Sequence, residues 1–400
     1  MKKRMLIIGI RMNAAGTEKS FLSFSKYIDY EKYDVELLLA SKTGEFLKFL
    51  PPQIKITDMG KWGWIFDITK DNAAALITKN VIKKNPFFAF SLLPYIIKMK
   101  RGGVSRLYAA NRLWVKLMKK MPVREEEYDI ALAYWGDHTM FYMVDKVNAK
   151  KKISWLHFDY DEPPREDALY LPYFEKNDKI VTVSNEIKNS VIKKFPSLES
   201  KTVVIENVID EDDVKRKAKE ETDFACDFDG IKILSVGRLC EQKGFDLAIP
   251  AVARLFREGE NVRYYIIGEG SGEYKRKLLD TARENGAEDC VRFLPRTDNP
   301  YKYMARCDIY LQPSRHEGKP ISVEEAKVLC LPICVTEYKS AREQLGDGSL
   351  GFICEISEEE IYNGLKTLLH DKDKREEYRT ALSKIEKREN NDIFERLADV

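Results

Sequence analysis

The segment 313–334, PSRHEGKPISVEEAKVLCLPIC, contains two carboxylates whose placement suits chemistry on a bound ligand. Glu317 stands in a loop that follows the apolar run Ile309–Gln312, and seven residues separate it from Glu325. The helix that carries Glu325 is predicted to begin near Ile321. A loop carboxylate and a helix carboxylate are thereby expected over one helix N-terminus.

The residues between these carboxylates favour close contact between the backbone and an anion. Gly318 has no side chain to hold a ligand away, and Pro320 presets the first turn of the helix. Free N–H groups at a helix N-terminus attract phosphate, whereas carboxylates accept hydrogen bonds from hydroxyls. The segment therefore predicts a site for a ligand with both groups, such as a nucleotide sugar.

A second loop, within SVGRLCEQKGFDLAI at 235–249, offers matching cations. A strand is predicted to end at Val236, Gly237 turns the chain, and Arg238 and Lys243 precede the next helix. Two cations at the carboxyl end of a parallel strand are well placed to neutralise a diphosphate leaving group. Cations in a surface loop are usually just solvated, so this loop is weak evidence by itself.

Two further segments follow predicted strands. In RMNAAGTEKSF, 11–21, Gly16 is where backbone can approach phosphate, although the segment is neither a G-x-G-x-x-G nor a Walker loop. In ISWLHFDYDEPP, 153–164, His157 lies at the carboxyl edge where open α/β sheets hold their sites. A structural hydrogen-bonding role is the alternative interpretation of His157.

Parallel strands must position these loops, and short apolar runs alternate with helical patterns along the whole chain. Near-continuous apolar strands separated by helices are typical of parallel sheets covered on both faces, so the predicted fold class is α/β. The runs are Met5–Ile10, Val35–Leu39, Ile130–Tyr134, Ile153–Leu156, Ile180–Val183, Val203–Ile205, Ile231–Val236, Tyr264–Ile267, Val291–Leu294, Ile309–Gln312, Ile333–Val335 and Gly351–Cys354.

One polar, charged stretch, Glu211–Gly230, separates the two sets of strands. We therefore expect an N-terminal domain at 1–206, a linker at 207–229 and a C-terminal domain at 230–375. The charged end, 376–400, is predicted to be a helix that returns to the N-terminal domain. A chain of 400 residues is too long for one core and suits two or three domains.

Composition excludes several classes of protein. Hydrophobic residues make up 44%, which rules out a disordered chain. The net charge is only +2, which argues against a nucleic-acid binder. No uncharged run in the first half exceeds the thirteen residues of Asn85–Ile97, whereas a membrane-spanning helix needs about 20. The start, MKKRMLIIGI, is interpreted as a strand and not as a signal peptide.

Charge is nonetheless uneven, because 72–123 contains no Asp or Glu. Within Arg106–Met121 apolar residues fall on one helical arc beside four cations, the pattern of a basic amphipathic helix. One interpretation is that this helix packs on the sheet with a solvated basic face; the other is that the surface docks on an anionic membrane, and both can hold together. The eleven cations of 72–123 are Lys79, Lys83, Lys84, Lys98, Lys100, Arg101, Arg106, Arg112, Lys116, Lys119 and Lys120.

The seven cysteines form no C-x-x-C pair, so we expect free thiols in a reducing cytosol. No histidine or second cysteine pair completes a zinc site around Cys330 and Cys334. Asp159, Asp161 and Glu162 have a spacing that suits solvated loop carboxylates at least as well as a metal cluster. The sequence therefore predicts no metal site.

Together these segments resemble glycosyltransferase family 4, retaining enzymes of the GT-B fold. Glu317 and Glu325 match the family's two glutamates with seven residues between them. SRHEGKPISVEEAK is similar to bacterial members that build cell-surface polysaccharide, and GRLCEQKGFDLAI resembles the block G-R-x-x-x-x-K-G-x-x-x-x-I. NAAGTEK resembles the family's Gly-Gly-x-Glu-Arg loop, and SWLHFD its histidine loop. YYIIGEG and VRFLPRTDNPYKYMARCDIYLQPS, which includes Arg296, resemble the stretch around the nucleobase.

The chain departs from the family pattern at two positions. Ala15 precedes Gly16 where the family often has a second glycine, which weakens the case for close phosphate approach there. Lys319 replaces the common aromatic residue after Gly318. A cation at this position is expected either to contact donor phosphate or sugar, or to face solvent.

The resemblance implies two Rossmann-like domains whose sheets face a central cleft, and transfer of a sugar from a nucleotide diphosphate, commonly UDP. Arg238 and Lys243 would stabilise the departing diphosphate, so no metal or other cofactor is required. Glu317 would orient the sugar, with His157 bordering the reacting centre, and Glu325 would hold the ribose. The implied donor-binding residues are Gly16, Gly237, Arg238, Lys243, Arg296, Glu317, Gly318, Lys319, Pro320, Ile321 and Glu325.

The same resemblance implies a glycan acceptor bound by the N-terminal domain, and the basic surface of 72–123 suggests a lipid-linked intermediate as the acceptor. The expected location is cytoplasmic, with a peripheral position on the inner face of the plasma membrane through 72–123. A nucleotide-sugar 2-epimerase of GT-B fold and a catalytically inactive GT-B scaffold subunit are the alternatives. The intact pairs of cations and glutamates argue against the scaffold.

Overall fold

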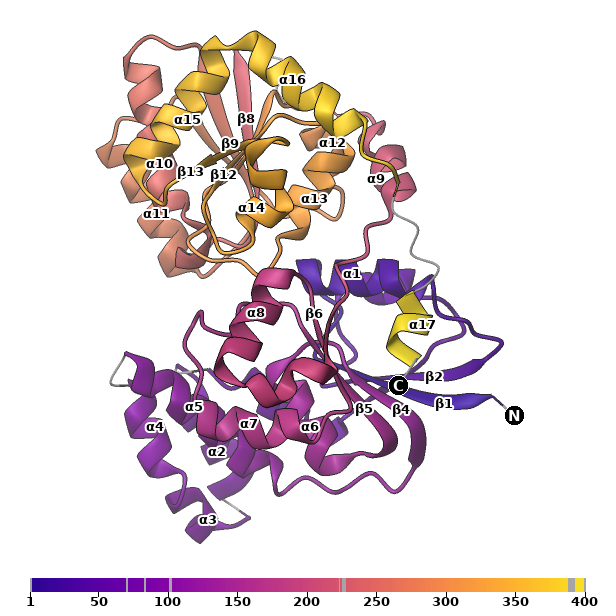
Figure 1. Cartoon of the computed structure of the whole chain (residues 1–400). Coiled ribbons are helices and arrows are strands. Elements are labelled where there is room, and N and C mark those ends of the chain that lie inside the picture. The colour runs from indigo at the N-terminus through magenta and orange to yellow at the C-terminus, as the bar shows by residue number, and fades with distance from the viewer. Residues whose placement is uncertain are drawn as a thin grey trace. The chain divides into compact units, whose positions relative to one another are not determined.

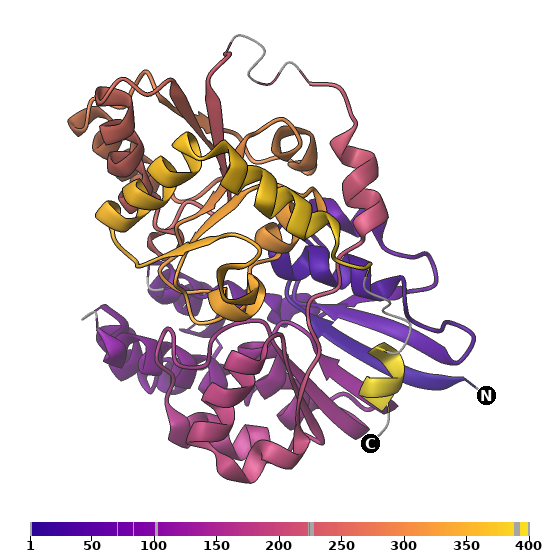
Figure 2. The same ribbon diagram turned by 45° about the horizontal axis from the view of Figure 1, so that its top comes forward.

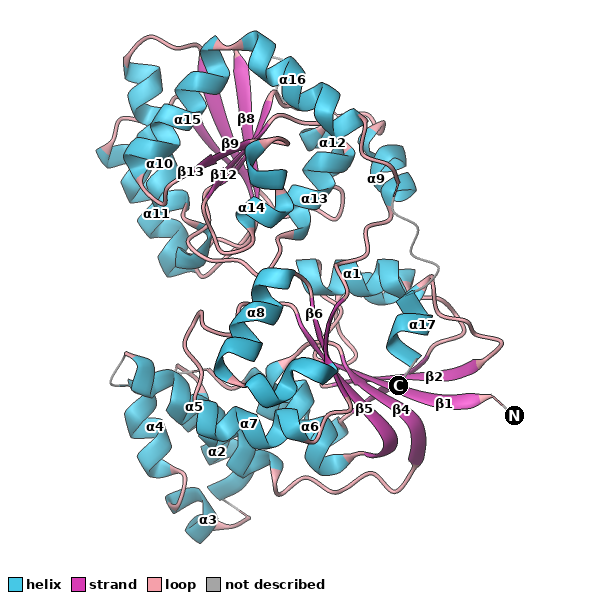
Figure 3. Ribbon diagram, in the orientation of Figure 1, coloured by secondary structure: helices cyan, strands magenta, loops and turns pink. Residues whose placement is uncertain are grey.

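A computed structural model describes residues 2–69, 71–82, 84–100, 103–222, 224, 228–387 and 393–398. The chain forms two compact units, one of Met1–Glu206 with Asn390–Val400 and the other of Asn207–Glu389 (Figure 1). Each unit contains a parallel sheet with helices packed against it (Figure 3). The predicted α/β class is confirmed.

The sheet of the first unit has seven parallel strands in the order β3-β2-β1-β4-β5-β6-β7. All but β3 coincide with predicted apolar runs. The sequence of β3, KITD, buries little at the edge of the sheet, so no apolar run marks it. The strands are β1 (Lys3–Gly9), β2 (Tyr33–Leu39), β3 (Lys55–Asp58), β4 (Glu127–Ala133), β5 (Asn148–Leu156), β6 (Lys179–Thr182) and β7 (Thr202–Val204).

Helices connect these strands and cover the sheet. They are α1 (Gly16–Ser25), α2 (Ala73–Ile77), α3 (Pro86–Phe90), α4 (Leu93–Lys100), α5 (Val104–Met118), α6 (Asp137–Lys146), α7 (Asp167–Glu175), α8 (Asn185–Lys194) and α17 (Ile393–Ala398), with the shorter turns η1 (Glu45–Phe49), η2 (Gly60–Asp67), η3 (Thr78–Ile82) and η4 (Pro196–Lys201). Helices α2 to α5 all lie in the long connection between β3 and β4, which places them at one end of this unit (Figure 1).

The sheet of the second unit has six parallel strands in the order β10-β9-β8-β11-β12-β13. The direction of strand addition reverses between β8 and β11, and open α/β sheets bind ligands outside the carboxyl ends of strands at such a switch point. The strands are β8 (Ile231–Val236), β9 (Val262–Ile267), β10 (Val291–Leu294), β11 (Ile309–Gln312), β12 (Ile333–Thr336) and β13 (Phe352–Cys354).

Both faces of this second sheet are buried, as its near-continuous apolar strands predict. Successive side chains of a strand point to opposite faces. Accordingly, Ile233 of β8 belongs to one buried cluster and Leu234 to another. The covering helices are α9 (Glu211–Ala218), α10 (Phe245–Arg257), α11 (Gly272–Glu284), α12 (Tyr301–Met304), α13 (Ile321–Val328), α14 (Ala341–Gln344), α15 (Glu358–His370) and α16 (Lys372–Ser383).

The segment 207–229, expected to be a linker, carries helix α9 and packs into the second unit. Val214 and Ala218 are buried beside Met304 of α12. Asp210 caps the helix by accepting a hydrogen bond from the Asp213 N–H at 2.9 Å. The sequence hides this helix because only two apolar residues attach it, whereas its charges face outward and pair along the helix. Asp223, Ala225, Cys226 and Asp227 lie outside the described residues.

The end of the chain divides between the two units, whereas a single helix was expected over 376–400. Helix α16 stays with the second unit, where Tyr378 and Leu382 are buried. Only α17 packs on the first unit, at the place that Figures 1 and 2 show beside β1 and β2. The Phe394 ring stacks on Phe24 with centroids 5.3 Å apart, and Lys179 donates to the backbone carbonyl of Arg396 at 2.6 Å.

The structure of α5 confirms the first interpretation of the basic amphipathic pattern, in which the helix packs its apolar side against the rest of its unit. Its apolar residues, including Leu113 and Trp114, are buried in the core of the first unit, and Arg112 forms an ion pair with Glu166. The helix therefore packs on the unit to which it belongs. Of the eleven cations, Lys83 and Arg101 lie outside the described residues.

Six cysteines of the described chain are free thiols, namely Cys240, Cys290, Cys307, Cys330, Cys334 and Cys354.

Among the described helices, none is both long enough and apolar enough to cross a bilayer.

A partly buried histidine of α6, His138, faces α5 and makes the first unit sensitive to pH. The His138 ring stacks on Trp114 with centroids 4.4 Å apart, and its Nε2 lies 3.3 Å from Asn111 Oδ1. Burial lowers the pKa of His138 from 6.5 to about 4. The imidazole is therefore neutral in the folded protein under conditions where the unfolded chain protonates it.

We expect the free energy of unfolding to fall as the pH is lowered from about 6.5 to about 4, because the unfolded state then binds the extra proton. Protonation of His138 in the unfolded chain lowers the free energy of unfolding by about 3 kcal/mol once the pH is below both pKa values. Urea unfolding of the protein and of His138→Phe across this range measures it. The unfolding free energy of the wild-type protein minus that of His138→Phe should decrease toward low pH. A difference that is independent of pH would contradict the assignment.

Candidate functional site

The two loops singled out in the second unit lie side by side, because β8 and β11 are neighbours in the sheet. One loop, 237–244, follows β8, and the other, 313–320, follows β11. The Arg315 N–H donates to the Gln242 carbonyl at 2.8 Å, and Gln242 Nε2 donates to the His316 carbonyl at 2.9 Å. The switch point of the sheet therefore brings the predicted cationic and acidic loops together.

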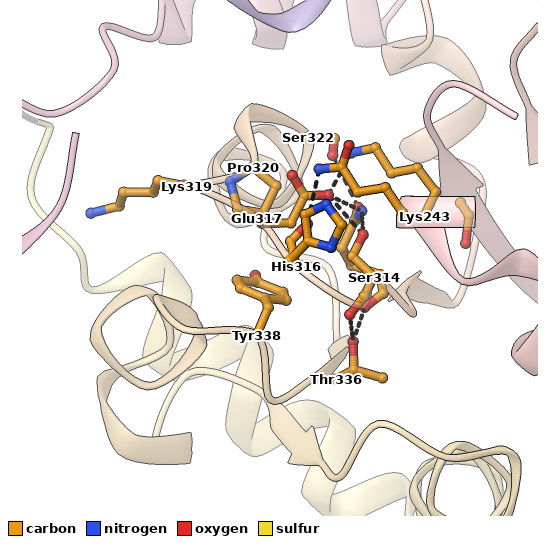
Figure 4. A network of polar contacts seen from close by, with 12 residues as sticks. Lys243, Ser314, His316, Glu317, Lys319, Pro320, Ser322, Thr336 and Tyr338 are labelled. Atoms are coloured by element: carbon orange, nitrogen blue, oxygen red, sulfur yellow. Dashed lines mark hydrogen bonds and ion pairs between the residues drawn. The ribbon is translucent and has the colours of Figure 1, made fainter. Parts of the chain in front are cut away.

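Glu317 is held in one orientation by donors that converge on a single oxygen (Figure 4). Its Oε1 accepts from Lys243 Nζ at 2.6 Å, from Ser314 Oγ at 2.7 Å and from Gln312 Nε2 at 3.3 Å. The Glu317 side chain is 9% exposed and that of Lys243 is 14% exposed. Within the described part of the chain, no hydrogen bond is made to the other oxygen, Oε2. The arrangement presents an oriented carboxylate oxygen beside a cation.

Gln312 supports this arrangement and was not predicted as a site residue. Its Oε1 accepts from Tyr310 OH at 2.9 Å and from Ser322 Oγ at 3.1 Å, which turns its amide N–H groups toward Ser314 and Glu317. Burial raises the pKa of Tyr310, so its phenol stays protonated and donates. Polar residues that interrupt the end of an apolar strand, in YLQPS, are the pattern that could have indicated Gln312 and Ser314.

A glycine allows the two loops to pack together. Gly244 has φ +64°, and a Cβ built on it would lie 1.8 Å from the Pro313 carbonyl oxygen. Only glycine combines that backbone conformation with so close an approach. Gly237 has a different role, since a Cβ there would lie 3.3 Å from Cδ and Cε of Lys243 and would press on that side chain.

We expect Gly244→Ala to lower the free energy of unfolding of the second unit by about 3 kcal/mol, from backbone strain plus the clash with Pro313. Gly286→Ala is a matched control, because Gly286 also has φ +64° and has open space around it. The control should lose only about 1 kcal/mol. Chemical denaturation compares the two, and equal losses would show that the loops do not pack as described.

An ion pair also fixes the loop after β11. The Arg315 guanidinium contacts both oxygens of Asp246 at 2.8 Å and donates to the Glu241 carbonyl at 2.7 Å. Although burial acts to raise it, the contact with Arg315 lowers the pKa of Asp246 below its ordinary value. Bidentate pairing of this kind adds geometric precision to a loop. Neither residue was predicted to belong to the site.

Glu325 lies on α13, as predicted, and is almost completely buried at 2% exposure. Its Oε1 accepts a hydrogen bond from Tyr301 OH at 2.8 Å. Burial, together with this carboxylate, raises the pKa of Tyr301, so the phenol remains a donor. One oxygen of Glu325 is therefore engaged by α12.

The residues between the two glutamates form the start of α13. Pro320 precedes the helix and Ile321 is its first residue, as predicted, with Gly318 in the buried turn before them. Lys319 does not face solvent, which was one of the two expectations for it. Its side chain is 4% exposed, lies 4.0 Å from Glu343 Oε1 and points away from Glu317 in Figure 4.

The two arginines assigned to donor binding, Arg238 and Arg296, are exposed. The contacts described below for them do not involve Glu317. Arg238 follows β8, and the described residues provide no ion pair or hydrogen bond to its side chain. Arg296 follows β10, and its Nε lies 3.7 Å from Glu269 Oε2. Both come directly after strands of the second sheet, which is the edge that also carries Lys243.

In the first unit, Gly16 is the first residue of α1, at the carboxyl end of β1. Ala15 caps the helix without a side-chain hydrogen bond, so the first N–H groups of α1 receive no cap from it. Glu45 accepts a hydrogen bond from the Ala14 N–H at 3.1 Å in the same loop.

His157 follows β5 in the first unit. Its ring lies 4.6 Å from that of Tyr134 and parallel to that of Trp155 at 5.7 Å. The following loop is fixed by Arg165, a buried residue that was not predicted. Arg165 donates to the carbonyls of Asp159, Tyr160 and Pro163 and pairs with Asp137 at 3.2 Å.

Two acidic residues of this loop, Asp159 and Asp161, have protein partners. Asp161 pairs with Lys194 at 3.2 Å, and Asp159 accepts from the Asp161 N–H at 3.0 Å. Over the ranges that the structure describes, no three His, Cys, Asp or Glu side chains gather as a potential metal site.

Comparison with known proteins finds a family model that matches part of the chain and relatives that match about half of it. Residues 217–384 match the model of the family described as glycosyl transferases group 1. The chain is 33% identical over 208 residues to the N-acetylgalactosamine-N,N'-diacetylbacillosaminyl-diphospho-undecaprenol 4-alpha-N-acetylgalactosaminyltransferase of Campylobacter jejuni, covering 52% of this chain and 54% of that relative. It is 31% identical over 158 residues to the O-antigen biosynthesis glycosyltransferase WclY of Escherichia coli, covering 39% of this chain and 42% of that one. The chain thus spans about half the length of these curated relatives.

The fold extends the similarity to the whole chain. The structure of Anabaena HepE in complex with UDP superposes with a TM-score of 0.68 over 100% of both chains, at 15% identity. At such identity the likeness concerns the fold alone. Residues 217–384 therefore match the glycosyl transferases group 1 family, within a chain that has the two Rossmann-like domains of the GT-B fold.

Proposed function

We propose that the protein is a retaining glycosyltransferase of family 4 that moves a sugar from a nucleotide diphosphate, UDP being the first candidate, to a glycan or lipid-linked acceptor in bacterial cell-surface polysaccharide synthesis. The observation that carries the proposal is the Glu317 carboxylate, oriented by three donors on Oε1 beside the Lys243 ammonium. The activities after which the two bacterial relatives are named, and the UDP bound to HepE, support the choice of acceptor class and donor.

In this proposal the donor diphosphate binds at the switch point of the second sheet. Lys243 keeps N–H donors for a phosphate oxygen while it contacts Glu317, since an ammonium has three. Arg238 adds a second cation, and the start of α13 at Pro320 and Ile321 adds free backbone N–H groups. These groups would stabilise the charge that develops on the leaving diphosphate, which needs no metal ion.

The sugar and the ribose would be held by the two glutamates. Glu317 Oε2 would accept a hydrogen bond from a hydroxyl of the transferred sugar, and Glu325 one from the ribose. Arg296 would lie toward the nucleobase, Gly237 and Gly318 would allow close approach of the backbone, and Lys319 would contribute charge. Tyr301, by engaging Glu325 Oε1, would fix the direction from which the ribose is bound.

The N-terminal unit would contribute Gly16 toward the phosphates and His157 toward sugar hydroxyls or the acceptor. The bond from the anomeric carbon to the β-phosphate oxygen breaks while the acceptor oxygen bonds to the same face of that carbon. The departing phosphate takes the proton of the acceptor hydroxyl. Such an enzyme would work at the cytoplasmic side of the membrane.

A screen of nucleotide sugars tests the proposal, with thermal stabilisation and donor hydrolysis as readouts. A nucleotide-sugar transferase is expected to be stabilised by one donor class and to release the nucleoside diphosphate slowly without acceptor. Stabilisation by none of the donors would contradict the proposal. Release of diphosphate with an epimerised sugar, and no transfer to any acceptor, would favour the 2-epimerase instead.

A further inference from the structure

A single buried amide stands behind the Glu317 carboxylate. Gln312, the last residue of β11, is 1% exposed, although glutamine lies mostly on protein surfaces. A polar group at such depth is unfavourable unless it is hydrogen-bonded, and both ends of this amide are hydrogen-bonded. An apolar side chain would fill the same space without that requirement, which points to a role beyond packing.

The hydrogen bonds of Gln312 run in one direction, toward Glu317. Tyr310 OH and Ser322 Oγ donate to its Oε1 at 2.9 and 3.1 Å. Its Nε2 therefore donates, to Ser314 Oγ at 2.8 Å and to Glu317 Oε1 at 3.3 Å, and Ser314 Oγ itself donates to the same Glu317 oxygen at 2.7 Å. Because these donors meet at Oε1, the direction of the Glu317 carboxylate is fixed and Oε2 is turned away from them.

The same amide connects two parts of the proposed donor site. Ser322 is the second residue of α13, and the first N–H groups of that helix are proposed to bind the diphosphate. Glu317, at the other end of the amide, is proposed to bind the transferred sugar, and both residues belong to the network drawn in Figure 4. Gln312 thus sets the position of the sugar-binding oxygen relative to the diphosphate-binding helix.

We propose that Gln312 is a positioning residue for sugar transfer, an inference that rests on the proposed function. It acts through Glu317, by holding Oε2 toward the hydroxyl of the transferred sugar. Lys243 and Ser314 attach Glu317 independently of Gln312, so loss of the amide leaves the loop in place and frees the carboxylate to change direction. An error of about 1 Å in the position of such a group can lower the rate about 10²-fold.

Gln312→Met removes the amide with little change in volume, and its effect is measured in two backgrounds. In the wild-type background, kcat with the donor that the nucleotide-sugar screen selects should fall about tenfold, whereas KM for that donor should change less than about threefold. In the Glu317→Gln background the same change should lower kcat by less than about twofold, because residues that act as one unit are not additive.

Gln344→Met is the matched control for this double-mutant cycle. Gln344 is also 1% exposed and accepts from Tyr338 OH at 2.7 Å, but its amide donates to the Pro320 carbonyl at 3.0 Å and to Glu324 Oε1 at 2.9 Å. Its effect on kcat should be the same factor in both backgrounds. Wild-type kcat in the Gln312→Met protein, or an equal loss in both backgrounds, would overturn the inference.

Gln312→Glu tests the contact with Glu317 without reference to activity. It places a second carboxyl group where Nε2 lies 3.3 Å from Glu317 Oε1. Two carboxylates so close do not both ionise readily, so the folded variant keeps a proton that the unfolded chain has released. Urea unfolding at several pH values measures this. The unfolding equilibrium constant of the variant, divided by that of the wild type, should fall at least about fivefold from pH 8 to pH 5.

The other titratable groups near this pair are common to both proteins, so the ratio isolates the new carboxyl group. They are Lys243 from the loop after β8, Tyr310 from β11, His316 from the Glu317 loop, Glu325 from α13 and Tyr338 from the loop after β12.

The pH measurement also separates this inference from the proposed function. A ratio that is independent of pH would show that residue 312 does not face Glu317, and it would overturn the inference even in an active transferase. A protein that no nucleotide sugar stabilises, but whose ratio changes with pH as expected, would overturn the proposed function and with it the role of Gln312 in transfer, while confirming the contact.

Discussion

Glu317→Gln is expected to lower kcat/KM for sugar transfer about 10²–10³-fold, the range found when one oriented polar contact to the reacting group is lost. The amide keeps the size of the carboxylate and can still accept from Ser314. It places an N–H group where the proposed sugar hydroxyl would donate, or turns one toward the Lys243 ammonium, and both arrangements are unfavourable. Glu317→Ala, which also removes the side chain, should abolish transfer.

The fold should survive these changes at Glu317. Loss of the partly buried contact with Lys243 costs about 1–3 kcal/mol of stability, which a well-folded domain tolerates. Thermal unfolding checks this, and Glu273→Gln, a change of the same type at an exposed residue of α11, is the matched control. Normal transfer by folded Glu317→Gln protein would show that the site has been assigned to the wrong residue.

Lys243→Met is expected to weaken binding of the nucleoside diphosphate at least about tenfold and to lower kcat/KM about 10³-fold. The larger effect on kcat/KM follows because the cation acts most strongly on charge that develops as the diphosphate leaves. Methionine fills a similar volume against Gly237, so the change removes charge with little repacking. Glu317 would keep Ser314 and Gln312 as donors.

Titration calorimetry with UDP, followed by steady-state kinetics, separates the two effects of Lys243→Met. Lys275→Met, at an exposed lysine of α11, is the control and should behave like wild type in both. A Lys243→Met protein that binds UDP as tightly as wild type would contradict the role of Lys243 at the diphosphate.

The strands of both sheets were predictable because a parallel strand that is buried on both faces needs an uninterrupted apolar run. Where burial is slight, that pattern disappears. Strand β3 at the sheet edge and α9, attached by Val214 and Ala218, were missed for this reason. Phe87 of α3 shows the same limit in reverse, because its side chain is exposed although an apolar run predicts burial.

The sequence predicts the two loops that carry Glu317 and Lys243, but it does not predict the contact between them. Glu317 and Lys243 were assigned separate ligand groups, and their ion pair spans 74 residues of sequence. The pair forms because β8 and β11 are neighbours, which is a property of the sheet order. Gln312 and Ser314 belong to an otherwise apolar strand end, and their role depends on which way their side chains point. The buried position of Lys319 likewise follows from packing that its charge does not reveal.

The central claim is transfer with retention at the anomeric carbon, and nuclear magnetic resonance of one reaction mixture tests it most directly. The mixture contains the purified protein, the donor that stabilises it and a lipid-linked or glycan acceptor. We predict one equivalent of nucleoside diphosphate for each new glycoside, and a product whose anomeric configuration is that of the donor. An inverted glycoside, or diphosphate released with no glycoside, would contradict the account.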